Sequence, residues 1–414
     1  MSPLDPALSP VHSPVVGPGD RLGILSVTTL YPNAAQPGHG VFVENRLRHL
    51  VESGEVALRV VAPVPWFPSG SARFGRYAAF ARAPLQETRH GIAVTHPRYP
   101  VIPKIGMSVA PALLYRPLVR HVEALVAAGH RFDLIDAHYF YPDGVAAALL
   151  GRRLGKPVLI TARGTDLNLI PQHVLPRRMI LWAANQAAGL ITVCQALKDV
   201  LVDLGVPSGR VSVLRNGVDL AQFRPVERES ARKALGLTNP TLLSVGHLIE
   251  RKGHHLVIEA LANLPGMTLL IAGDGPERSA LQRLVERHGL GDRVRLLGSV
   301  PHDRLPQIYG AADALILASS REGWANVLLE AMACGTPVVA SNVWGTPEVV
   351  ADPAAGTLAA ERTPRGIADG VRRLFQALPD RAATRAYAEQ FSWDSTTQGQ
   401  LDLFRKVLEG RTSR

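Results

Sequence analysis

Short, continuous apolar runs alternate with helix-length segments along the first half of the chain. They predict strands at residues 22–27, 58–61, 134–137, 158–161, 190–193 and 211–214. The first run is followed by a loop rich in proline and glycine, and then by a helical pattern that begins near Phe42. Strands that are apolar throughout, with helices between them, indicate a parallel sheet that is covered on both faces.

A second series of the same kind begins after a junction around residues 216–225. It predicts strands at residues 241–245, 269–272, 294–297, 314–318 and 338–340. We therefore expect an α/β protein with two doubly wound, Rossmann-like domains, residues 21–218 and 219–392, which face each other across a cleft. A last amphipathic helix near residues 396–408 belongs to a segment, 393–414, that is expected to pack back on the first domain.

Composition agrees with two globular domains, because 414 residues exceed what one hydrophobic core usually organises. Residues 1–20 are rich in Pro, Ser and Gly without apolar periodicity, which predicts a disordered leader and no secretion signal. No apolar run approaches the roughly 18 residues of a membrane-spanning helix, so a cytoplasmic protein is expected. Cys194 and Cys334 lie far apart inside apolar stretches, and we expect buried hydrophobes instead of a disulfide or a metal site.

The net charge of +10 indicates an acidic partner, such as a phosphorylated substrate or an anionic membrane. Much of this charge lies between residues 61 and 121, where Glu87 is the one acid. The segment contains Arg73, Arg76, Arg82, Arg89, Arg98, Lys104, Arg116 and Arg120, with Trp66, Phe67, Phe74, Tyr77 and Phe80 between them. Together with the apolar stretch 102–118, it is either a solvated face or a surface that rests on an anionic membrane and contributes ~1 kcal/mol per cation.

Candidate chemistry follows the predicted strand 314–318, which leads into a loop and a helix. Ligands of open parallel sheets bind beyond the carboxyl ends of the strands, and the free N–H groups of a helix N-terminus attract anions. The helix start at Asn326, Val327 and Leu328 is therefore a candidate diphosphate site.

Two carboxylates accompany this corner, Glu322 in the loop and Glu330 in the helix. A carboxylate can accept hydrogen bonds from two neighbouring hydroxyls, which a ribose or a sugar ring presents. On spacing alone, Glu330 is equally well explained as a solvated helix residue. Glu322 is equally well explained as a first-turn acid that the helix dipole favours.

The residues from Glu322 onward read Glu-Gly-Trp-Ala-Asn-Val-Leu-Leu-Glu-Ala-Met-Ala-Cys-Gly-Thr-Pro-Val-Val-Ala. This pattern resembles the signature of the retaining glycosyltransferase family 4. Supporting matches are Arg-Lys-Gly at 251–253, Gly-Asp-Gly-Pro at 273–276 and Asn-Gly-Val-Asp at 216–219. The resemblance implies a GT-B fold and the transfer of a hexosyl group from a UDP- or GDP-sugar. Among family members, the chain looks most similar to bacterial teichuronic acid and surface-polysaccharide glycosyltransferases.

The resemblance assigns the charged residues to the sugar nucleotide, which is the donor substrate; no cofactor is implied. Glu330 would hold the ribose and Glu322 the hydroxyls of the donor sugar. Lys252, with Arg251, would neutralise the diphosphate, on which negative charge develops as the glycosyl bond breaks. No Asp-X-Asp pair lies beside these groups, in keeping with a family that needs no metal.

Glycine-rich turns complete the implied donor site. Backbone groups at Gly246, Leu297 and Gly298 would meet the nucleotide. In the first domain, the loop that ends at Gly40 would approach the donor phosphate or the acceptor, although a tight turn alone also explains its glycines.

The acceptor side resembles the family less closely. His138 follows the strand 134–137, where the family places a histidine beside the donor sugar. Arg163 and Asp166 belong to an Arg-Gly-Thr-Asp run that resembles an acceptor-side motif, with Arg where His is common. His247 stands where many members have an Arg toward the phosphates. The implied acceptor is a glycan or a polyprenyl-diphosphate-linked sugar, and attack from the front face is the mechanism usual in the family.

Two other functions stay open at this point. A sugar-nucleotide epimerase or hydrolase on the same fold would use the same diphosphate corner. A non-catalytic protein that binds polyanions or membranes would use the basic segment between residues 61 and 121. Nucleic acid is not an expected partner, because the sequence contains none of the recognised binding modules.

Overall fold

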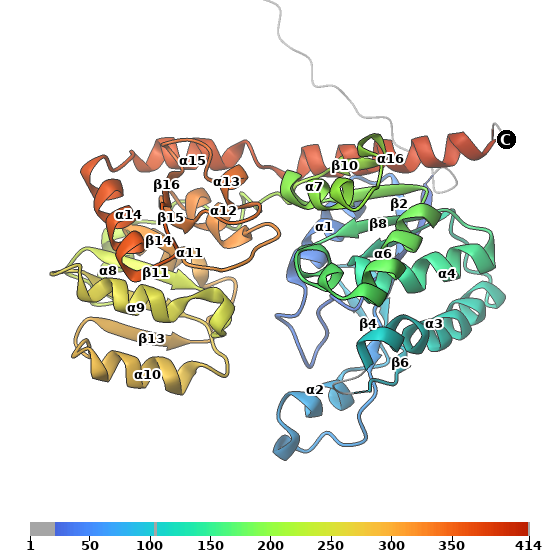
Figure 1. Ribbon diagram of the computed structural model, residues 1–414, viewed down its shortest axis with the longest axis horizontal. Coiled ribbons are helices and arrows are strands. Elements are labelled where there is room, and N and C mark those ends of the chain that lie inside the picture. The colour runs from blue at the N-terminus through green and yellow to red at the C-terminus, as the bar shows by residue number, and fades with distance from the viewer. Residues whose placement is uncertain (1–20, 103–105, 413–414) are drawn as a thin grey trace, which may run out of the picture.

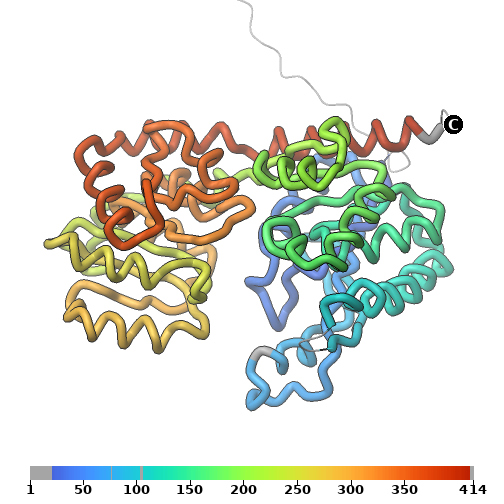
Figure 2. The backbone as a smooth tube through the Cα atoms, viewed as in Figure 1, coloured from blue at the N-terminus to red at the C-terminus, as the bar shows by residue number. Residues whose placement is uncertain are grey.

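The computed structural model describes residues 21–102 and 106–412. They form two α/β domains that lie side by side (Figure 1). The chain crosses between the domains twice (Figure 2), and the backbone N–H of Val218 donates to the carbonyl of Phe391 where the crossings meet. The predicted leader, residues 1–20, lies outside the described residues. Within the described part of the chain, no helix is both long and apolar enough to cross a membrane.

The first domain is built on an eight-stranded sheet in the order β10-β9-β8-β7-β1-β2-β5-β4. Its strands are β1 (Leu22–Val27), β2 (Val56–Val61), β4 (Gln86–Arg89), β5 (Ile92–Thr95), β7 (Leu134–His138), β8 (Val158–Ala162), β9 (Gly189–Thr192) and β10 (Val211–Val213). Neighbouring strands are parallel except β4 and β5. Every strand predicted in this half is present, with ends shifted by at most two residues.

The sequence prediction missed the edge of this sheet, the hairpin of β5 and β4. Its turn consists of His90 and Gly91, whose φ angles of 48° and 77° suit a two-residue turn between twisted antiparallel strands. β4 alternates between exposed and half-buried residues. It therefore lacks the continuous apolar run that identified the central strands.

Helices cover both faces of the first sheet. They are α1 (Val41–Glu52), α3 (Ala110–Ala127), α4 (Val145–Leu154), α5 (Thr165–Asn168), α6 (Val174–Gln186) and α7 (Gln195–Asp203). Alternate strand residues point to opposite faces. Ile24 and Leu134 share a core with side chains of α1, and Leu25 and Ile135 share another with α3 and α4. A unit formed by β3 (Val64–Pro65), β6 (Arg98–Tyr99) and α2 (Arg76–Arg82) projects from the domain (Figure 1).

The second domain contains a six-stranded sheet in the order β13-β12-β11-β14-β15-β16, in which all neighbours are parallel. Its strands are β11 (Thr241–Val245), β12 (Thr268–Ala272), β13 (Val294–Gly298), β14 (Ala314–Leu317), β15 (Val338–Ser341) and β16 (Gly356–Ala359). Its helices are α8 (Arg228–Ala234), α9 (His254–Ala262), α10 (Arg278–Arg287), α11 (Leu305–Ala311), α12 (Asn326–Ala333), α13 (Thr346–Val349), α14 (Pro364–Gln376) and α15 (Arg381–Glu389). Only the short, half-buried edge strand β16 was not predicted in this half.

The last helix, α16 (Trp393–Thr412), begins three residues before the predicted start at 396. It follows the second domain in the sequence but lies along the first domain (Figure 1). Its residues Leu401 and Phe404 are buried in the same core as Val43 and Leu47 of α1. Apolar burial on the first domain therefore holds this helix in place.

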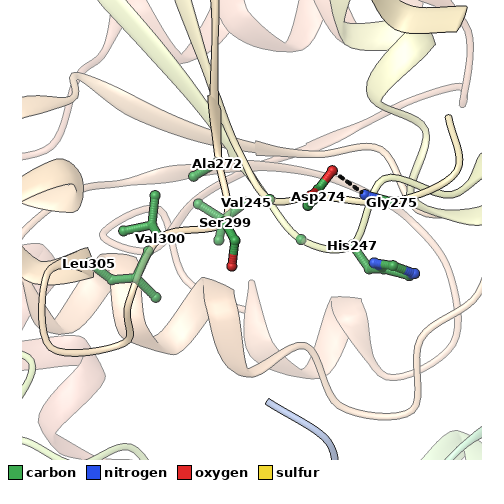
Figure 3. A pocket seen from close by; sticks show the side chains of 10 residues that line it. Val245, His247, Ala272, Asp274, Gly275, Ser299, Val300 and Leu305 are labelled. Atoms are coloured by element: carbon green, nitrogen blue, oxygen red, sulfur yellow. Dashed lines mark hydrogen bonds between the residues drawn. The ribbon is translucent and has the colours of Figure 1, made fainter. Parts of the chain in front are cut away.

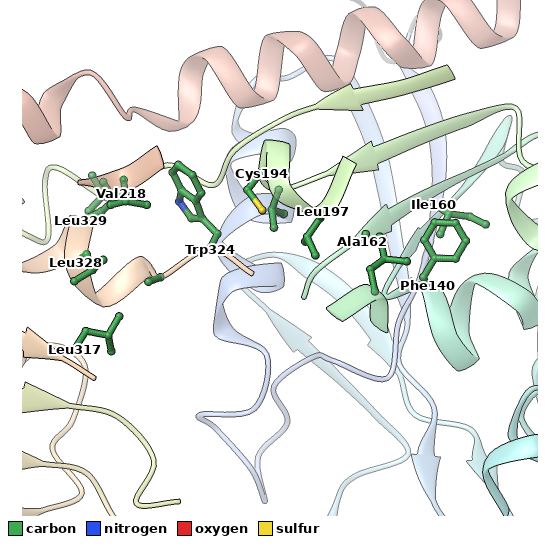
Figure 4. Close-up of a cluster of buried hydrophobic side chains, with 14 of the residues drawn as sticks. Phe140, Ile160, Ala162, Cys194, Leu197, Val218, Leu317, Trp324, Leu328 and Leu329 are labelled. Atoms are coloured by element: carbon green, nitrogen blue, oxygen red, sulfur yellow. The ribbon is translucent and has the colours of Figure 1, made fainter. Parts of the chain in front are cut away.

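The two domains touch through backbone and through apolar side chains. A Cβ added at Gly323 would lie only 2.0 Å from the carbonyl oxygen of Arg163. Cys194 of the first domain and Trp324 of the second belong to one continuous apolar cluster (Figure 4). Cys194 and Cys334 are both free and buried, as their apolar surroundings predicted.

The basic segment between residues 61 and 121 is not one continuous face, contrary to the sequence interpretation. Arg89 pairs with Glu44, with 2.5 Å between Nε and Oε1. Arg98 donates to the carbonyl oxygen of Ala83. Leu114, within the apolar stretch 102–118, is fully buried in the core. Part of the segment thus stabilises the fold, and residues 103–105 lie outside the described residues.

Replacing Gly323 by alanine should destabilise the contact between the domains, because the new methyl group would overlap the Arg163 carbonyl. We expect a loss of about 1–3 kcal/mol, the usual cost of overpacking, seen as a lower midpoint of thermal unfolding. Gly291→Ala is the control, since a Cβ at Gly291 meets no heavy atom within 4 Å. Equal midpoints for the two variants would contradict the contact.

Candidate active site

A cavity of about 390 Å³ lies between the two domains. Of the residues predicted to form the site, those that line it are Arg163, Arg251, Lys252, Glu322, Asn326 and Val327. The cavity opens beyond the carboxyl ends of β8 and β14, where ligands of parallel sheets bind. The fold therefore brings residues of both halves of the chain to one site.

Two cations and a carboxylate meet on the second-domain wall of this cavity. The Nζ atom of Lys252 donates to Oε1 of Glu322 at 2.7 Å, and Nη1 of Arg251 lies 3.7 Å from Oε2. Arg251 also donates to the carbonyl oxygen of Arg321 at 2.7 Å, which fixes its direction. Burial alone would raise the pKa of Glu322, but Lys252 and Arg251 hold that pKa below its ordinary value. The carboxylate is thus ionised and paired.

Backbone conformation brings these cations next to the loop that follows β14. The turn carrying Arg251 and Lys252 ends at Gly253, whose φ is 71° and whose added Cβ would lie 2.1 Å from the carbonyl oxygen of Ala318. Only glycine permits this approach. The N-terminus of α12 completes the wall, but the predicted residue Leu328 is buried in the core and leaves only its backbone near the site.

A second pocket, of about 580 Å³, lies on the second domain at the carboxyl ends of β11, β12 and β13. Its lining residues are Val245, Gly246, His247, Ala272, Gly273, Asp274, Gly275, Ser299, Val300 and Leu305. Val245, Val300 and Leu305 lie toward one end, and His247 and Asp274 toward the other (Figure 3). A Cβ on Gly246 would lie 3.6 Å from Cε of Lys252, so this pocket adjoins the cation wall.

The predicted residues Leu297 and Gly298 are not among those that line this pocket. The pocket lining begins with the next two residues, Ser299 and Val300. The carbonyl oxygen of Gly298 accepts the backbone N–H of Gly273 at 2.8 Å. The lining residues Ser299 and Val300 directly follow the predicted residues in the chain.

Glu330 extends from α12 toward the loop that closes the second pocket. Its Oε2 accepts the Tyr309 hydroxyl at 2.8 Å, and its Oε1 lies 3.5 Å from Nε2 of His302. Burial would lower the pKa of His302, but Glu330 outweighs this effect and raises the pKa. Gln222 in turn donates to Nδ1 of His302 at 2.9 Å. Glu330 is therefore a carboxylate held by Tyr309 and by His302, which belongs to the same loop as Ser299 and Val300 of the second pocket, and it is not a solvated helix residue.

His138 lies behind the cavity wall instead of lining it. It is fully buried, with Nε2 3.1 Å from Oδ2 of Asp136, and its Nδ1 accepts from Nη2 of Arg163. Burial, together with Arg163, lowers the pKa of His138 to about 4 despite Asp136, so the ring is neutral near pH 7. Arg163 is the member of this pair that reaches the cavity, and it also donates to Asn216 at 3.1 Å.

Two other first-domain predictions have a structural explanation. Asp166 is fully buried and accepts backbone N–H groups of Phe140 and of the 163–164 turn at 2.6 to 3.1 Å, so it shapes the loop and does not line the cavity. Gly40 precedes α1 with a φ of 75°, and an added Cβ would lie 2.4 Å from the carbonyl of Leu30. The glycine brings Leu30 to the cavity lining.

The structure adds lining residues that the sequence reasoning missed. Phe42, Tyr139, Asn168, Asn216 and Arg321 all line the cavity. Asn216, in the motif at the junction, was a detectable signal, and Nδ2 of its side chain donates to Asn326 at 3.3 Å. Tyr139 has a φ of 95°, a rare conformation for a residue other than glycine, and no sequence pattern indicates it.

Two family models match consecutive parts of the chain. The model of Glycosyltransferase Family 4 matches residues 38–222, and the model of Glycosyl transferases group 1 matches residues 226–391. A curated relative is the D-inositol 3-phosphate glycosyltransferase of Mycobacterium tuberculosis, 36% identical over 316 residues. This alignment covers 70% of the present chain and 65% of the relative, so the chain spans just under two thirds of that protein.

Solved structures show the fold. Sucrose-phosphate synthase from Thermosynechococcus elongatus superposes with a TM-score of 0.74 at 21% identity, covering 94% of this chain and 100% of that one. Anabaena HepE in complex with UDP superposes with a TM-score of 0.72 at 23% identity, covering 93% and 100%. With these matches and the two parallel sheets, the chain has the GT-B fold, with a Glycosyltransferase Family 4 domain followed by a Glycosyl transferases group 1 domain.

Proposed function

We propose that this protein is a retaining, metal-independent hexosyltransferase. It transfers a sugar from a UDP- or GDP-sugar to a glycan or a polyprenyl-diphosphate-linked acceptor in the synthesis of a surface polysaccharide. The second domain, residues 219–392, holds the donor, and the first domain, residues 21–218, holds the acceptor.

The observation that carries the proposal is the order of groups along the second domain. The pocket at Gly246 adjoins Lys252, and Lys252 lies in the cavity with Arg251 and the N-terminus of α12. An apolar slot for a base, fixed cations for a diphosphate and a cavity for a sugar therefore follow one another. A nucleoside-diphosphate sugar has this sequence of parts.

Glu330 fits the ribose of such a donor. Its two oxygens are held by Tyr309 and His302, and both still have lone pairs that can accept the two ribose hydroxyls. HepE, a neighbour in fold, has been solved with UDP and with UDP-glucose. The likeness in fold to these two HepE complexes supports a nucleotide-sugar donor here, and UDP is the first nucleotide to test.

The chemistry follows from the charges. When the bond between sugar C1 and the phosphate oxygen breaks, its electron pair stays on the diphosphate. Arg251, Lys252 and the N–H groups of α12 stabilise that charge without a metal ion. The acceptor hydroxyl attacks C1 from the same face and transfers its proton to the departing phosphate oxygen, so the configuration is retained.

A lipid-linked acceptor would place the protein at the inner face of a membrane. The projecting unit around α2 exposes large apolar side chains, with Trp66 60% and Val101 51% exposed. Ile102, at 43%, lies beside them, and Arg73 and Arg82 of the same unit are exposed. Aromatic and apolar side chains flanked by arginines fit the interface of an anionic bilayer. We propose this part of the basic segment as a peripheral membrane contact.

The function is tested by incubating the protein with UDP-glucose, UDP-galactose, UDP-N-acetylglucosamine and GDP-mannose, with and without glycan acceptors, and measuring the nucleoside diphosphate released. Release that an acceptor accelerates identifies a transferase. Equal release without an acceptor identifies a hydrolase, and conversion of the sugar without release identifies an epimerase. No turnover and no binding of any donor would refute the proposal.

Glu330→Gln should weaken UDP binding about 10- to 100-fold, because hydrogen bonds to a charged group contribute about 1.5–3 kcal/mol. Isothermal titration calorimetry with UDP measures the effect. Glu286→Gln is the matched control on the exposed surface of α10. Unchanged UDP affinity in Glu330→Gln would remove Glu330 from the ribose site.

The membrane contact predicts that the protein sediments with vesicles of phosphatidylcholine and phosphatidylglycerol, and that added salt releases it. Trp66→Ser/Ile102→Ser should reduce the bound fraction, because both side chains leave water on binding. Leu378→Ser, which changes a side chain 47% exposed on the second domain, is the control. The membrane contact would be refuted if the protein bound equally well to vesicles of phosphatidylcholine alone, or if all variants bound to the same extent.

A further inference from the structure

A chain of buried polar groups runs behind the cavity, from the C-terminal helix to Arg163. Nε of Arg46 donates to Oε1 of Gln400 at 2.8 Å, and Nε2 of Gln400 donates to Oδ2 of Asp136 at 2.7 Å. The same Oδ2 lies 3.1 Å from Nε2 of His138, whose Nδ1 accepts from Arg163. These contacts join residues that are far apart in the sequence.

This network of buried polar groups continues past the wall of the cavity. Arg163 donates to Asn216 at 3.1 Å, and Asn216 donates to Asn326 at 3.3 Å. Asn326 is the first residue of α12, the helix whose N-terminus faces the proposed diphosphate site. The network thus connects α16, which lies on the first domain, with the donor side of the cavity.

Gln400 is an unusual residue for its place in α16. It is fully buried, and the neighbouring residue Leu401, together with Phe404, belongs to an apolar core. Burying an amide costs free energy unless its donor and its acceptor are both used. Gln400 uses both, toward Asp136 and Arg46. A leucine would fill the same space with less polar surface, so packing alone does not explain the glutamine.

The hydrogen-bond donors and acceptors in this network fix the tautomer of His138. Arg163 can only donate, so Nδ1 of His138 accepts and the ring proton is on Nε2, which lies 3.1 Å from Oδ2 of Asp136 but is not aligned for a hydrogen bond. Oδ1 of Asp136 is buried and has no hydrogen-bond partner among the described residues, so the orientation of this carboxylate depends on Oδ2. Gln400 is the group outside β7 that donates to that oxygen.

We propose that Gln400 is a positioning residue for the transfer reaction. By holding Asp136, it keeps the His138 ring in one orientation, and His138 in turn keeps the guanidinium of Arg163 directed into the cavity, where the sugar and the acceptor meet. This inference rests on the proposed function. Because Gln400 contacts Asp136 and Arg46 of the first domain directly, and reaches Asn326 only through Asp136, His138, Arg163 and Asn216, it acts mainly on turnover and little on the affinity for the nucleotide.

The test compares substitutions on one helix. Gln400→Glu keeps the acceptor for Arg46 but removes the amide that donates to Asp136. Gln398→Glu is the matched control, because Gln398 is exposed on the same helix and donates to Asp402. Gln400→Met, which removes both hydrogen bonds and keeps the volume, serves if thermal unfolding shows that the first variant does not fold.

With the donor that the wild type turns over in the screen above, kcat of Gln400→Glu should fall roughly 10- to 100-fold, the usual cost of a small displacement of a reacting group. The Kd for UDP should change less than about twofold in the same variant. Gln398→Glu should leave both quantities within about twofold of the wild type. A purely structural role would instead lower kcat and UDP affinity together.

A double-mutant cycle tests the contact itself. In the variant Asp136→Asn/Gln400→Glu, the amide and the carboxylate exchange places, so a hydrogen bond between positions 136 and 400 is restored. The combined loss in kcat should be smaller than the product of the two single losses. Multiplicative losses, or a kcat for Gln400→Glu equal to that of Gln398→Glu in an active enzyme, would overturn the inference. A wild type that turns over no donor would instead overturn the proposed function.

Discussion

The close contact of two glycine-containing loops is the constraint on which the site depends. Gly164 has a φ of 145°, and an added Cβ would lie 3.1 Å from the backbone N and Cα of Gly323. With no side chain between them, the loop after β8 and the loop after β14 approach to backbone distance. Arg163 and Glu322, the neighbours of these glycines, therefore line the same cavity although they are far apart in the chain. A bulkier residue at either position would separate the two halves of the site.

The approach of the two loops gathers positively charged side chains around the cavity. Among the described residues that line the cavity, the cations are Arg163, Arg251, Lys252 and Arg321, and the one carboxylate is Glu322. Burying ions costs several kcal/mol each unless they are paired, and Glu322 cannot pair with all of them. An anion that enters the cavity would neutralise this excess positive charge. A diphosphate would supply negative charge next to Lys252 and Arg251.

Features formed by residues close together in the sequence could be predicted from it, and features formed by distant residues could not. The second-domain wall of the cavity could be predicted because one strand, loop and helix carry Glu322 and Asn326 within a few residues, and because Lys252 follows another apolar strand. The edge strands β4 and β16 were missed since half-exposed strands lack an apolar run. The pair of Asp136 and Gln400 was out of reach, because 264 positions separate them and only the return of α16 to the first domain joins them.

The position of His138 also bears on where the acceptor proton goes. Its Nδ1 accepts from Arg163, its Nε2 faces Asp136, and burial lowers its pKa to about 4, so it presents no free basic nitrogen to the cavity. Glu322, the carboxylate in the lining, is paired with Lys252, and its pKa lies below the ordinary value. Neither group suits the removal of a proton from a hydroxyl. In the proposed transfer, the base that this cavity leaves is the oxygen of the departing diphosphate, which would gain charge as the bond to the sugar breaks, and attack from the front face would bring the acceptor hydroxyl next to it.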